Sequence, residues 1–418
     1  MPAALFRRRP VRRSPERTGS PWCVGRRTGP TWARRRMRPR RPDEQHRVAS
    51  PLELLFNLTF VVAVAAAAAE LAHSLAEGHQ ELAGFLQVFF TIWWAWMNFT
   101  WFASAYDTDD VPYRLLTMLQ MGGVLVLAAG VPAAAAEADF RLVTLGYVIM
   151  RSGQVVQWVR AGVENPEERR TAFRNAAGIS LLQVGWLVRL ATGETTMLTF
   201  VCLAALELTV PWWAQRRRDT GWHPHHIAER YSLFTIILLG ESVLAVSNAV
   251  RATEVSTGLV VVGVGGLVLL FSLWWLYFLQ PAGHGLERRR DRSYVWGYCH
   301  FGLFAALAAL GAGLEVAVEQ TSHHLPISPT SAGYAVAAPA ALFVGLLWGV
   351  TRTLLARPTL RLSASVVAVV LIALAPLLAP YAGGPLVVVL VAVVCVLAVA
   401  VTLVQEAASS PGTTSPHS

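Results

Sequence analysis

The sequence predicts an all-α, polytopic membrane protein: a bundle of about twelve transmembrane helices. Three observations lead to this prediction: an apolar composition, a series of long apolar runs, and arginines that alternate from loop to loop. Of the 418 residues, 54% are hydrophobic and only 15% are charged, whereas soluble globular chains carry about 25% charged residues. The composition therefore excludes an ordinary soluble protein.

The apolar runs are long enough to cross a bilayer, which takes about 20 mostly apolar residues per helix. They are continuous rather than alternating, which argues against the strands of a transmembrane barrel. In chain order the twelve runs are Leu52 to Leu75, Leu82 to Ala105, Tyr113 to Val131, Leu142 to Val159, Phe173 to Leu190, Thr196 to Trp213, Ile227 to Val250, Gly258 to Leu279, Tyr294 to Gly313, Tyr334 to Thr351, Leu362 to Leu378 and Pro385 to Val404. The fifth and the eleventh are the weakest.

Arginine indicates which loops face the cytoplasm. All 35 basic residues are Arg, and the net charge is +9. With the N-terminus inside, the outside loops hold only Arg141 and Arg251. The inside loops hold Arg114, Arg160, Arg169, Arg170, Arg174, Arg216, Arg217, Arg218, Arg288, Arg289, Arg290, Arg292, Arg352, Arg357 and Arg361. This positive-inside bias predicts a bacterial cytoplasmic membrane protein with both termini cytoplasmic.

Most of the remaining basic charge lies in the N-terminal tail, where fifteen arginines fall between Arg7 and Arg47. The tail is rich in Arg, Pro, Gly and Ser and lacks apolar periodicity, so we expect it to be disordered. Met37 is an alternative start of the chain. Because the tail and the cytoplasmic loops account for the positive net charge, that charge does not indicate nucleic-acid binding. We expect the lipid bilayer, and no nucleic acid, as a partner.

A weak internal repeat predicts two halves of six helices each. "ELLFNLTFVV" at Glu53 and "ERYSLFTIIL" at Glu229 both open a long run, and a tryptophan pair follows each, Trp93-Trp94 and Trp274-Trp275. Because each half has an even number of helices, both halves enter the membrane from the same side. They would therefore be related by an axis along the membrane normal, as in parallel transporter repeats. The predicted segments are a disordered tail (1–49), a first half (50–215), a cytoplasmic linker (216–225), a second half (226–405) and a disordered C-terminal tail (406–418).

Ionisable residues inside the membrane are the first candidates for function, because each costs about 2.5 to 3.5 kcal/mol at the bilayer centre. Arg151, Glu207 and Glu241 are the deepest. One interpretation is a proton- or ion-coupled site at mid-membrane, where burial and an approaching cation shift the pKa of a carboxylate. The other is a buried ion pair that only locks helices together.

The seventh run carries its polar groups on one side. At about 100° per residue, His226, Arg230 and Glu241 lie at roughly 0°, 40° and 60°, with Glu229 at about −60°. This stripe must face protein or water, so His226, Glu229 and Arg230 join the candidates for substrate or ion coupling. For Glu53, Glu229 and Arg230 a helix-terminal role is the alternative, because a carboxylate in the first turn offsets the macrodipole.

Two polar motifs raise the question of a metal. "YDTDDVPYR" offers Asp107, Asp109 and Asp110, but the further ligands of a Ca²⁺ loop are missing, and Asp110 also fits as the N-cap of the next helix. In "HPHHIAER" the neighbouring His225 and His226 point to different sides of a helix, which disfavours zinc. We therefore expect no metal and no cofactor.

Several motifs together resemble the bacterial low-temperature-requirement A (LtrA) family of multi-pass membrane proteins. They are "SPLELLFNLTFVVAV", "WWAWMNFTWFASAYDTDDVPYRLLTMLQM", "HIAERYSLFTIILLGES" and "WWLYF". The resemblance covers residues 50–403 and implies a multi-pass membrane protein without supplying a reaction. The family's distinctive polar positions correspond to Glu53, Asn57, Asp107, Asp109, Asp110, Arg114, His226, Glu229, Arg230, Gly240, Glu241 and Ser242. Asn57 departs from the pattern, because relatives tend to have Asp there.

Three classes of function follow. The leading hypothesis is a secondary transporter or permease for an unknown small molecule or ion, in which the two halves rock about a mid-membrane polar site. The second is a membrane enzyme acting on lipid or a lipid-linked substrate, which requires the aspartate cluster and His226 with Glu229 to converge. The third is a non-catalytic sensor or scaffold, whose polar stripe would be fully paired.

Overall fold

The computed structural model describes residues 33–40, 49–78, 82–106, 108–216, 220–251, 254–279, 282–321, 325–355 and 360–409. Across these ranges, helices are the only regular secondary structure apart from one isolated β-bridge between Pro39 and Tyr106. The helices are α1 (Pro51–Ala76), α2 (Leu82–Ala105), α3 (Val111–Ala129), α4 (Val131–Glu137), α5 (Arg141–Glu164), α6 (Arg169–Ala191), α7 (Met197–Gln215), α8 (Pro224–Arg251), α9 (Thr257–Phe278), α10 (Ala282–Arg288), α11 (Ser293–Glu319), α12 (Pro329–Leu354), α13 (Leu362–Leu374), α14 (Ala379–Ala382) and α15 (Gly384–Ser409), with short 3₁₀ turns η1 (Arg290–Arg292) and η2 (Ala375–Leu378).

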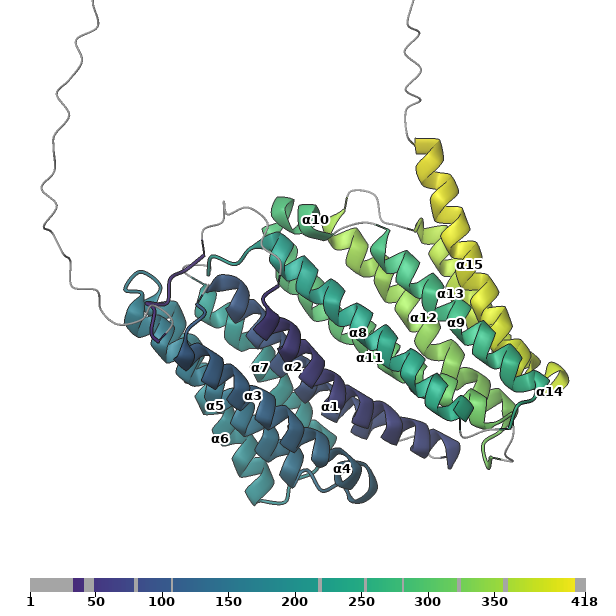
Figure 1. Cartoon of the computed structure of the whole chain (residues 1–418), viewed down its shortest axis with the longest axis horizontal. Helices are drawn as coiled ribbons and strands as arrows, with labels where there is room; N and C mark the ends of the chain where they lie inside the picture. The colour runs from purple at the N-terminus through teal and green to yellow at the C-terminus, as the bar shows by residue number, and fades with distance from the viewer. Residues whose placement is uncertain are drawn as a thin grey trace, which may run out of the picture.

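Eleven of the twelve predicted runs form a long helix, and the run from Leu362 to Leu378 forms the shorter α13 followed by η2. This confirms the polytopic helical bundle. Successive long helices alternate in direction, so α1 begins and α15 ends at the same face, together with α10 (Figure 1). We call this the Arg-rich face. α4 and α14 lie at the opposite face. Several helices extend beyond the predicted runs: α8 begins at Pro224 and α12 at Pro329, and α5 continues to Glu164, α11 to Glu319 and α15 to Ser409.

Ten helical segments of the described chain are long and apolar enough to cross a membrane. The other two long helices, α5 and α6, are of similar length but carry polar residues along their buried faces, including Arg151, Gln154 and Gln157 on α5. α5 packs against α3 and α6, and α6 packs against α5 and α7. They therefore rely on neighbouring helices rather than on lipid to accommodate their polar side chains.

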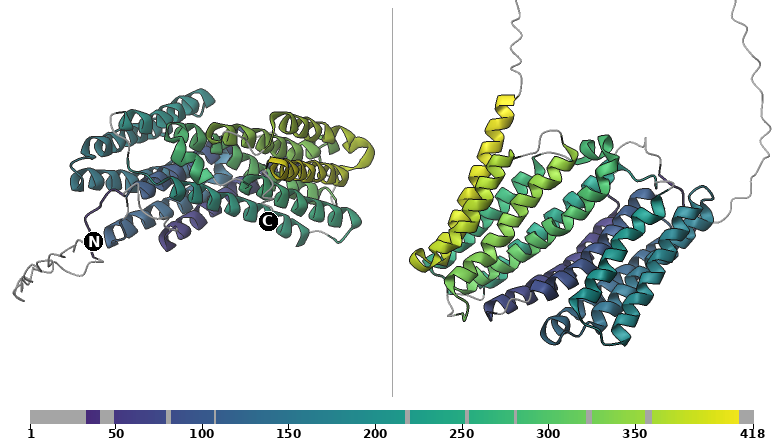
Figure 2. Two further views of the ribbon diagram at one scale, coloured as in Figure 1. Left: turned by 90° about the horizontal axis from the view of Figure 1, so that it is seen from above. Right: turned by 180° about the vertical axis from the view of Figure 1, so that it is seen from behind.

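The long helices form two groups with α1 and α2 between them (Figures 1 and 2). In the first group α3 packs on α5, α5 on α6 and α6 on α7. In the second, α8 and α12 pack on α11, and α15 packs on α9. α1 contacts α3 on one side and α8 and α11 on the other. The tryptophan pairs of the sequence repeat are not equivalent, since Trp93 and Trp94 are buried in α2 whereas Trp274 and Trp275 are exposed on α9.

Small residues set the distance between α3 and α5. A Cβ added at Gly146 would lie 2.5 Å from the carbonyl oxygen of Gly123, and one added at Gly123 would lie 2.8 Å from the carbonyl oxygen of Gly146. Glycine at both positions lets the two backbones meet, as at many membrane helix interfaces.

Gly146→Val should therefore force α3 and α5 apart. We expect the free energy of unfolding to fall by about 1 to 3 kcal/mol, the usual cost of overpacking a core, measured by denaturant titration in detergent. Gly122→Val is the matched control, because a Cβ there meets no atom within 4 Å. Equal loss in both variants would contradict a specific glycine contact.

Part of the N-terminal tail is ordered, contrary to the expectation for residues 1–49. Residues 33–40 lie on the Arg-rich face as a strap, with Met37 fully buried. The backbone N–H of Arg40 donates to the carbonyl of Ala105 (2.9 Å), and the Nε of Arg36 donates to the carbonyl of Glu164 (2.8 Å). Backbone pairing and one buried apolar side chain fix the strap despite its polar composition. Residues 1–32 and 410–418 lie outside the described residues.

Candidate functional site

Arg151 and Glu207 form a closed ion pair in the first helix group. The Nη2 of Arg151 donates to the Oε2 of Glu207 at 2.8 Å, and the two side chains are 1% and 0% exposed. Arg151 comes from α5 and Glu207 from α7, so the pair links two helices that flank α6. The Nη1 of Arg151 also donates to Gln154 (3.0 Å).

Glu207 is surrounded by hydrogen-bond donors. Besides Arg151, four side chains donate to its two oxygens: Trp94 (2.7 Å), Tyr147 (3.1 Å), Gln183 (3.2 Å) and Trp186 (3.2 Å). They come from α2, α5 and α6, so one carboxylate joins four helices. These donors were not among the residues predicted from the sequence, although a buried Trp N–H or Tyr O–H requires an acceptor.

A second polar cluster joins the first turns of α1 and α8 at the Arg-rich face. Glu53 forms a capping box with Ser50, and its Oε2 lies 3.0 Å from the Nε2 of His226. The Nη1 of Arg230 donates to the backbone carbonyl of Glu53 (2.7 Å). All three side chains are buried. We call Glu53, His226 and Arg230 the gate cluster.

The gate cluster continues inward as a layer of aromatic side chains. Trp96 donates to the Oδ1 of Asn57 (2.8 Å) and stacks on Phe234 with ring centroids 4.3 Å apart. Trp101 donates to Tyr231 (3.1 Å). The Arg-rich end of the contact between α1, α2 and α8 is thus filled with side chains. Glu229, the remaining candidate, accepts from the backbone of Ala49 (3.2 Å).

The acidic loop before α3 is a structural cap and not part of the gate cluster. Asp110 accepts the N-cap hydrogen bond from the backbone of Tyr113 and pairs with Arg160 at 2.6 Å. Asp109 pairs with Arg114, also at 2.6 Å, in an exposed position. Asp107 lies outside the described residues. Burial raises the pKa of the Asp110 carboxyl, but hydrogen bonds from Arg160 and from backbone N–H groups outweigh it and hold that pKa below its usual range.

Asp110→Asn should loosen the strap, because Arg35 donates its backbone N–H to Asp110 (2.8 Å). Asn still caps α3, but it loses the charge opposite Arg160. We expect a fall of about 1 to 3 kcal/mol in the free energy of unfolding at neutral pH, and faster tryptic cleavage within residues 33–40.

The pH dependence supplies the check on this prediction. The pKa of Asp110 is lowered in the folded state. The ionised carboxylate therefore contributes to the free energy of unfolding above the ordinary carboxyl pKa of about 3.9, and this contribution is lost as the pH falls through the folded pKa. The difference between wild type and Asp110→Asn should therefore vanish in acid. Asp109→Asn, which removes an exposed pair, should leave stability unchanged. A difference that persists unchanged in acid would contradict the role given to Asp110.

Glu241 lies apart from the Arg151–Glu207 pair, in a cavity of about 280 Å³ between α1, α8 and α11. A second carboxylate, Glu315 on α11, lines the same cavity and interacts electrostatically with Glu241. Ser242 and Asn248 add polar groups, and five small residues of α1 form the facing wall. Among the described residues, no cation or hydrogen-bond donor reaches either carboxylate. Glu315 was not among the candidates predicted from the sequence, because the predicted run ended at Gly313 whereas α11 extends to Glu319.

An apolar cavity of about 670 Å³ lies on the other side of α1, between α1, α2, α11 and α12. Leu75, Phe85 and Leu342 are among its lining residues, with Ser331 and Tyr334 as polar groups. Both cavities occupy the half of the molecule away from the Arg-rich face. The contacts of α1 are therefore tight at the gate cluster and open beyond it.

Comparison with known proteins identifies the family of this chain. The family model for "Bacterial low temperature requirement A protein (LtrA)" matches residues 48–401. The chain belongs to the LtrA family. A protein of Rhizobium meliloti (strain 1021), described as uncharacterized, is 25% identical over 292 residues, covering 66% of this chain and 70% of that protein. No solved structure matches the chain.

Membership of the LtrA family confirms the resemblance and establishes a multi-pass membrane protein. The structure gathers the family-like polar residues into three places: the gate cluster with Asn57 and Glu229, the cap around Asp110, and the cavity of Glu241. Asp110 and His226 have separate partners, Arg160 and Glu53. The convergence that a lipid-modifying enzyme required is therefore not seen among the described members of the two motifs.

Proposed function

We propose that this LtrA protein is a cation-coupled secondary transporter, with Glu241 and Glu315 as its coupling site. The observation that carries the proposal is the pair of carboxylates sharing one cavity with no cationic partner among the described residues. Two like charges in a membrane interior repel each other, and a proton or a metal cation between them removes the repulsion.

The contrast with Glu207 supports this choice of site. Glu207 accepts hydrogen bonds from five side chains, including Arg151, so its negative charge is already compensated. Such a carboxylate has no need of a cation. We therefore assign Arg151 and Glu207 to holding the first helix group together and Glu241 to coupling.

The distribution of packing around α1 supports alternating access. We infer that the Arg-rich face is cytoplasmic, which makes the structure an outward-facing state with a closed inner gate. The gate cluster has polar atoms that are free to form new hydrogen bonds when the helices move. In the described chain, the Nε and Nη2 of Arg230 and the Nδ1 of His226 are buried without a hydrogen-bond partner. The apolar cavity is of the size that binds small molecules, so we propose an apolar or amphipathic substrate.

Carbodiimide labelling tests the coupling site without knowledge of the substrate. Dicyclohexylcarbodiimide is apolar and modifies carboxyl groups in their protonated form. We expect mass spectrometry of labelled protein to find Glu241 or Glu315 modified, with labelling that decreases as the pH rises. Glu207 is the internal control and should remain unlabelled. Labelling of Glu207 alone, or of none of the three, would contradict the proposal.

A further inference from the structure

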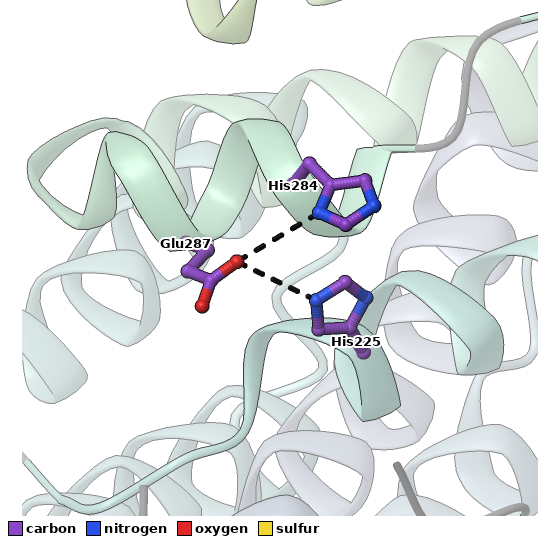
Figure 3. Close-up of side chains that lie close together, drawn as sticks. All are labelled: His225, His284 and Glu287. Carbon is purple, nitrogen blue, oxygen red and sulfur yellow. Dashed lines mark ion pairs between the residues drawn. The ribbon is translucent and has the colours of Figure 1, made fainter. Parts of the chain in front are cut away.

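A cluster of three metal-ligating side chains lies on the Arg-rich face, away from both cavities. His225 is in the first turn of α8, and His284 and Glu287 lie three residues apart on α10 (Figure 3). One ligand atom from each, the Nε2 of His225, the Nδ1 of His284 and the Oε2 of Glu287, converges with the others. All three atoms lie within 4.8 Å of one another.

The distances fit a metal site that is open to solvent. The Oε2 of Glu287 lies 3.6 Å from the Nε2 of His225 and 3.8 Å from the Nδ1 of His284. Ligands about 2.1 Å from one metal ion stand about 3.0 to 3.4 Å apart, so small side-chain rotations suffice. His284 and Glu287 are exposed enough to make them, at 70% and 61%.

The backbone beneath the cluster is fixed by packing. Leu286, between the two ligands of α10, is fully buried, and α10 packs against α8 and α12. A Cβ at Gly283 would overlap the Nδ1 of His225, so glycine there allows the imidazole to rest against α10. This close packing positions the ring beside α10, with its Nε2 3.6 Å from the Oε2 of Glu287.

We propose that His225, His284 and Glu287 bind a divalent transition-metal ion of the Zn²⁺ type. Two imidazoles and one carboxylate suit Zn²⁺, Co²⁺ or Ni²⁺ better than Mg²⁺ or Ca²⁺, which prefer oxygen ligands. Water completes the coordination on the exposed side. The motif "HPHHIAER" predicted no metal because it contributes only His225 on α8, and the other two ligands come from α10. The bound ion ties α10 to the first turn of α8.

Co²⁺ is the probe for the site, because its visible absorption reports bound nitrogen and oxygen ligands. We expect the full-length chain, purified with a histidine-free tag and stripped with chelator, to bind Co²⁺ and to release it on addition of Zn²⁺. His284→Ala and Glu287→Gln should each weaken the affinity at least about tenfold. Both replace exposed side chains, so the fold should be preserved.

Two further variants make the test specific. His73→Ala is the matched control, because His73 and Glu77 form an exposed pair on the opposite face with Nε2 and Oε1 3.4 Å apart, and its affinity should equal that of wild type. Gly283→Ala keeps all three ligands but displaces His225, and it should also bind more weakly. Zn²⁺ should raise the melting temperature of wild type and not of Glu287→Gln. Absence of Co²⁺ binding in wild type, or wild-type affinity in His284→Ala and Glu287→Gln, would overturn the proposal.

Discussion

Glu207→Gln is expected to lower the free energy of unfolding by about 3 to 5 kcal/mol, because it leaves the charge of Arg151 buried without a counter-charge. Arg151→Met should cost a similar amount by leaving Glu207 uncompensated. The carboxylate joins α2, α5, α6 and α7, so its loss affects the whole first helix group. Far-UV circular dichroism during denaturant titration in detergent measures the change.

The double variant Arg151→Met with Glu207→Gln separates the ion pair from the rest of the packing. Removing both charges leaves no buried ion, so we expect the double variant to lose clearly less than the sum of the single losses. Glu241→Gln is the control, since it exchanges an intramembrane carboxylate that lacks donors in the described chain, and it should not reduce stability. Additive losses would show that the pair is not coupled.

Glu241→Gln and Glu315→Gln are expected to reduce cation-coupled transport at least about tenfold while leaving stability intact. Glutamine keeps the shape of the side chain but cannot exchange a proton or offer a negative charge to a cation. Removing one of two neighbouring carboxylates also relieves their repulsion, so melting temperatures should stay level or rise. The expected loss of transport is therefore not a consequence of misfolding.

Proteoliposomes on solid-supported membranes provide the measurement. A panel of apolar and amphipathic solutes is applied under a proton or sodium gradient, and the displaced charge is recorded. Glu70→Gln is the matched control, because Glu70 is another glutamate of a membrane-spanning helix, α1, but lines neither the cavity of Glu241 nor the apolar cavity. Wild-type currents in the variant lacking both Glu241 and Glu315 would exclude the proposed coupling site.

The helices were predictable because they depend on local properties of the chain. Every apolar run became a helix, and even the weak fifth run formed α6. Helix length and alternation follow from the thickness of the bilayer and the position of arginines, which are visible without knowledge of contacts. Asp110 as the cap of α3 was predictable for the same reason, since a cap is a contact with residues three positions away.

The partners of the polar residues were not predictable from one sequence. Arg151, Glu207 and Glu241 are equivalent in the sequence as intramembrane charges, yet two form a pair and the third shares a cavity with Glu315. Which side chains meet depends on the rotation and tilt of each helix, and these are set by packing against helices far away in the sequence. Gly123 and Gly146 illustrate this, because their contact fixes α3 against α5.

The sequence by itself determined the multi-pass helical fold of the LtrA family, the positions of the helices along the chain and the candidate polar residues. Only the tertiary structure decided that Glu207 is compensated, that Glu241 shares a cavity with Glu315, that residues 33–40 form a strap, and that His225 meets α10. The reason is physical: burial in lipid is a property of each segment, whereas compensation of charge is a property of pairs. A pair exists only when two distant segments are brought within a few ångströms by the packing of all the others.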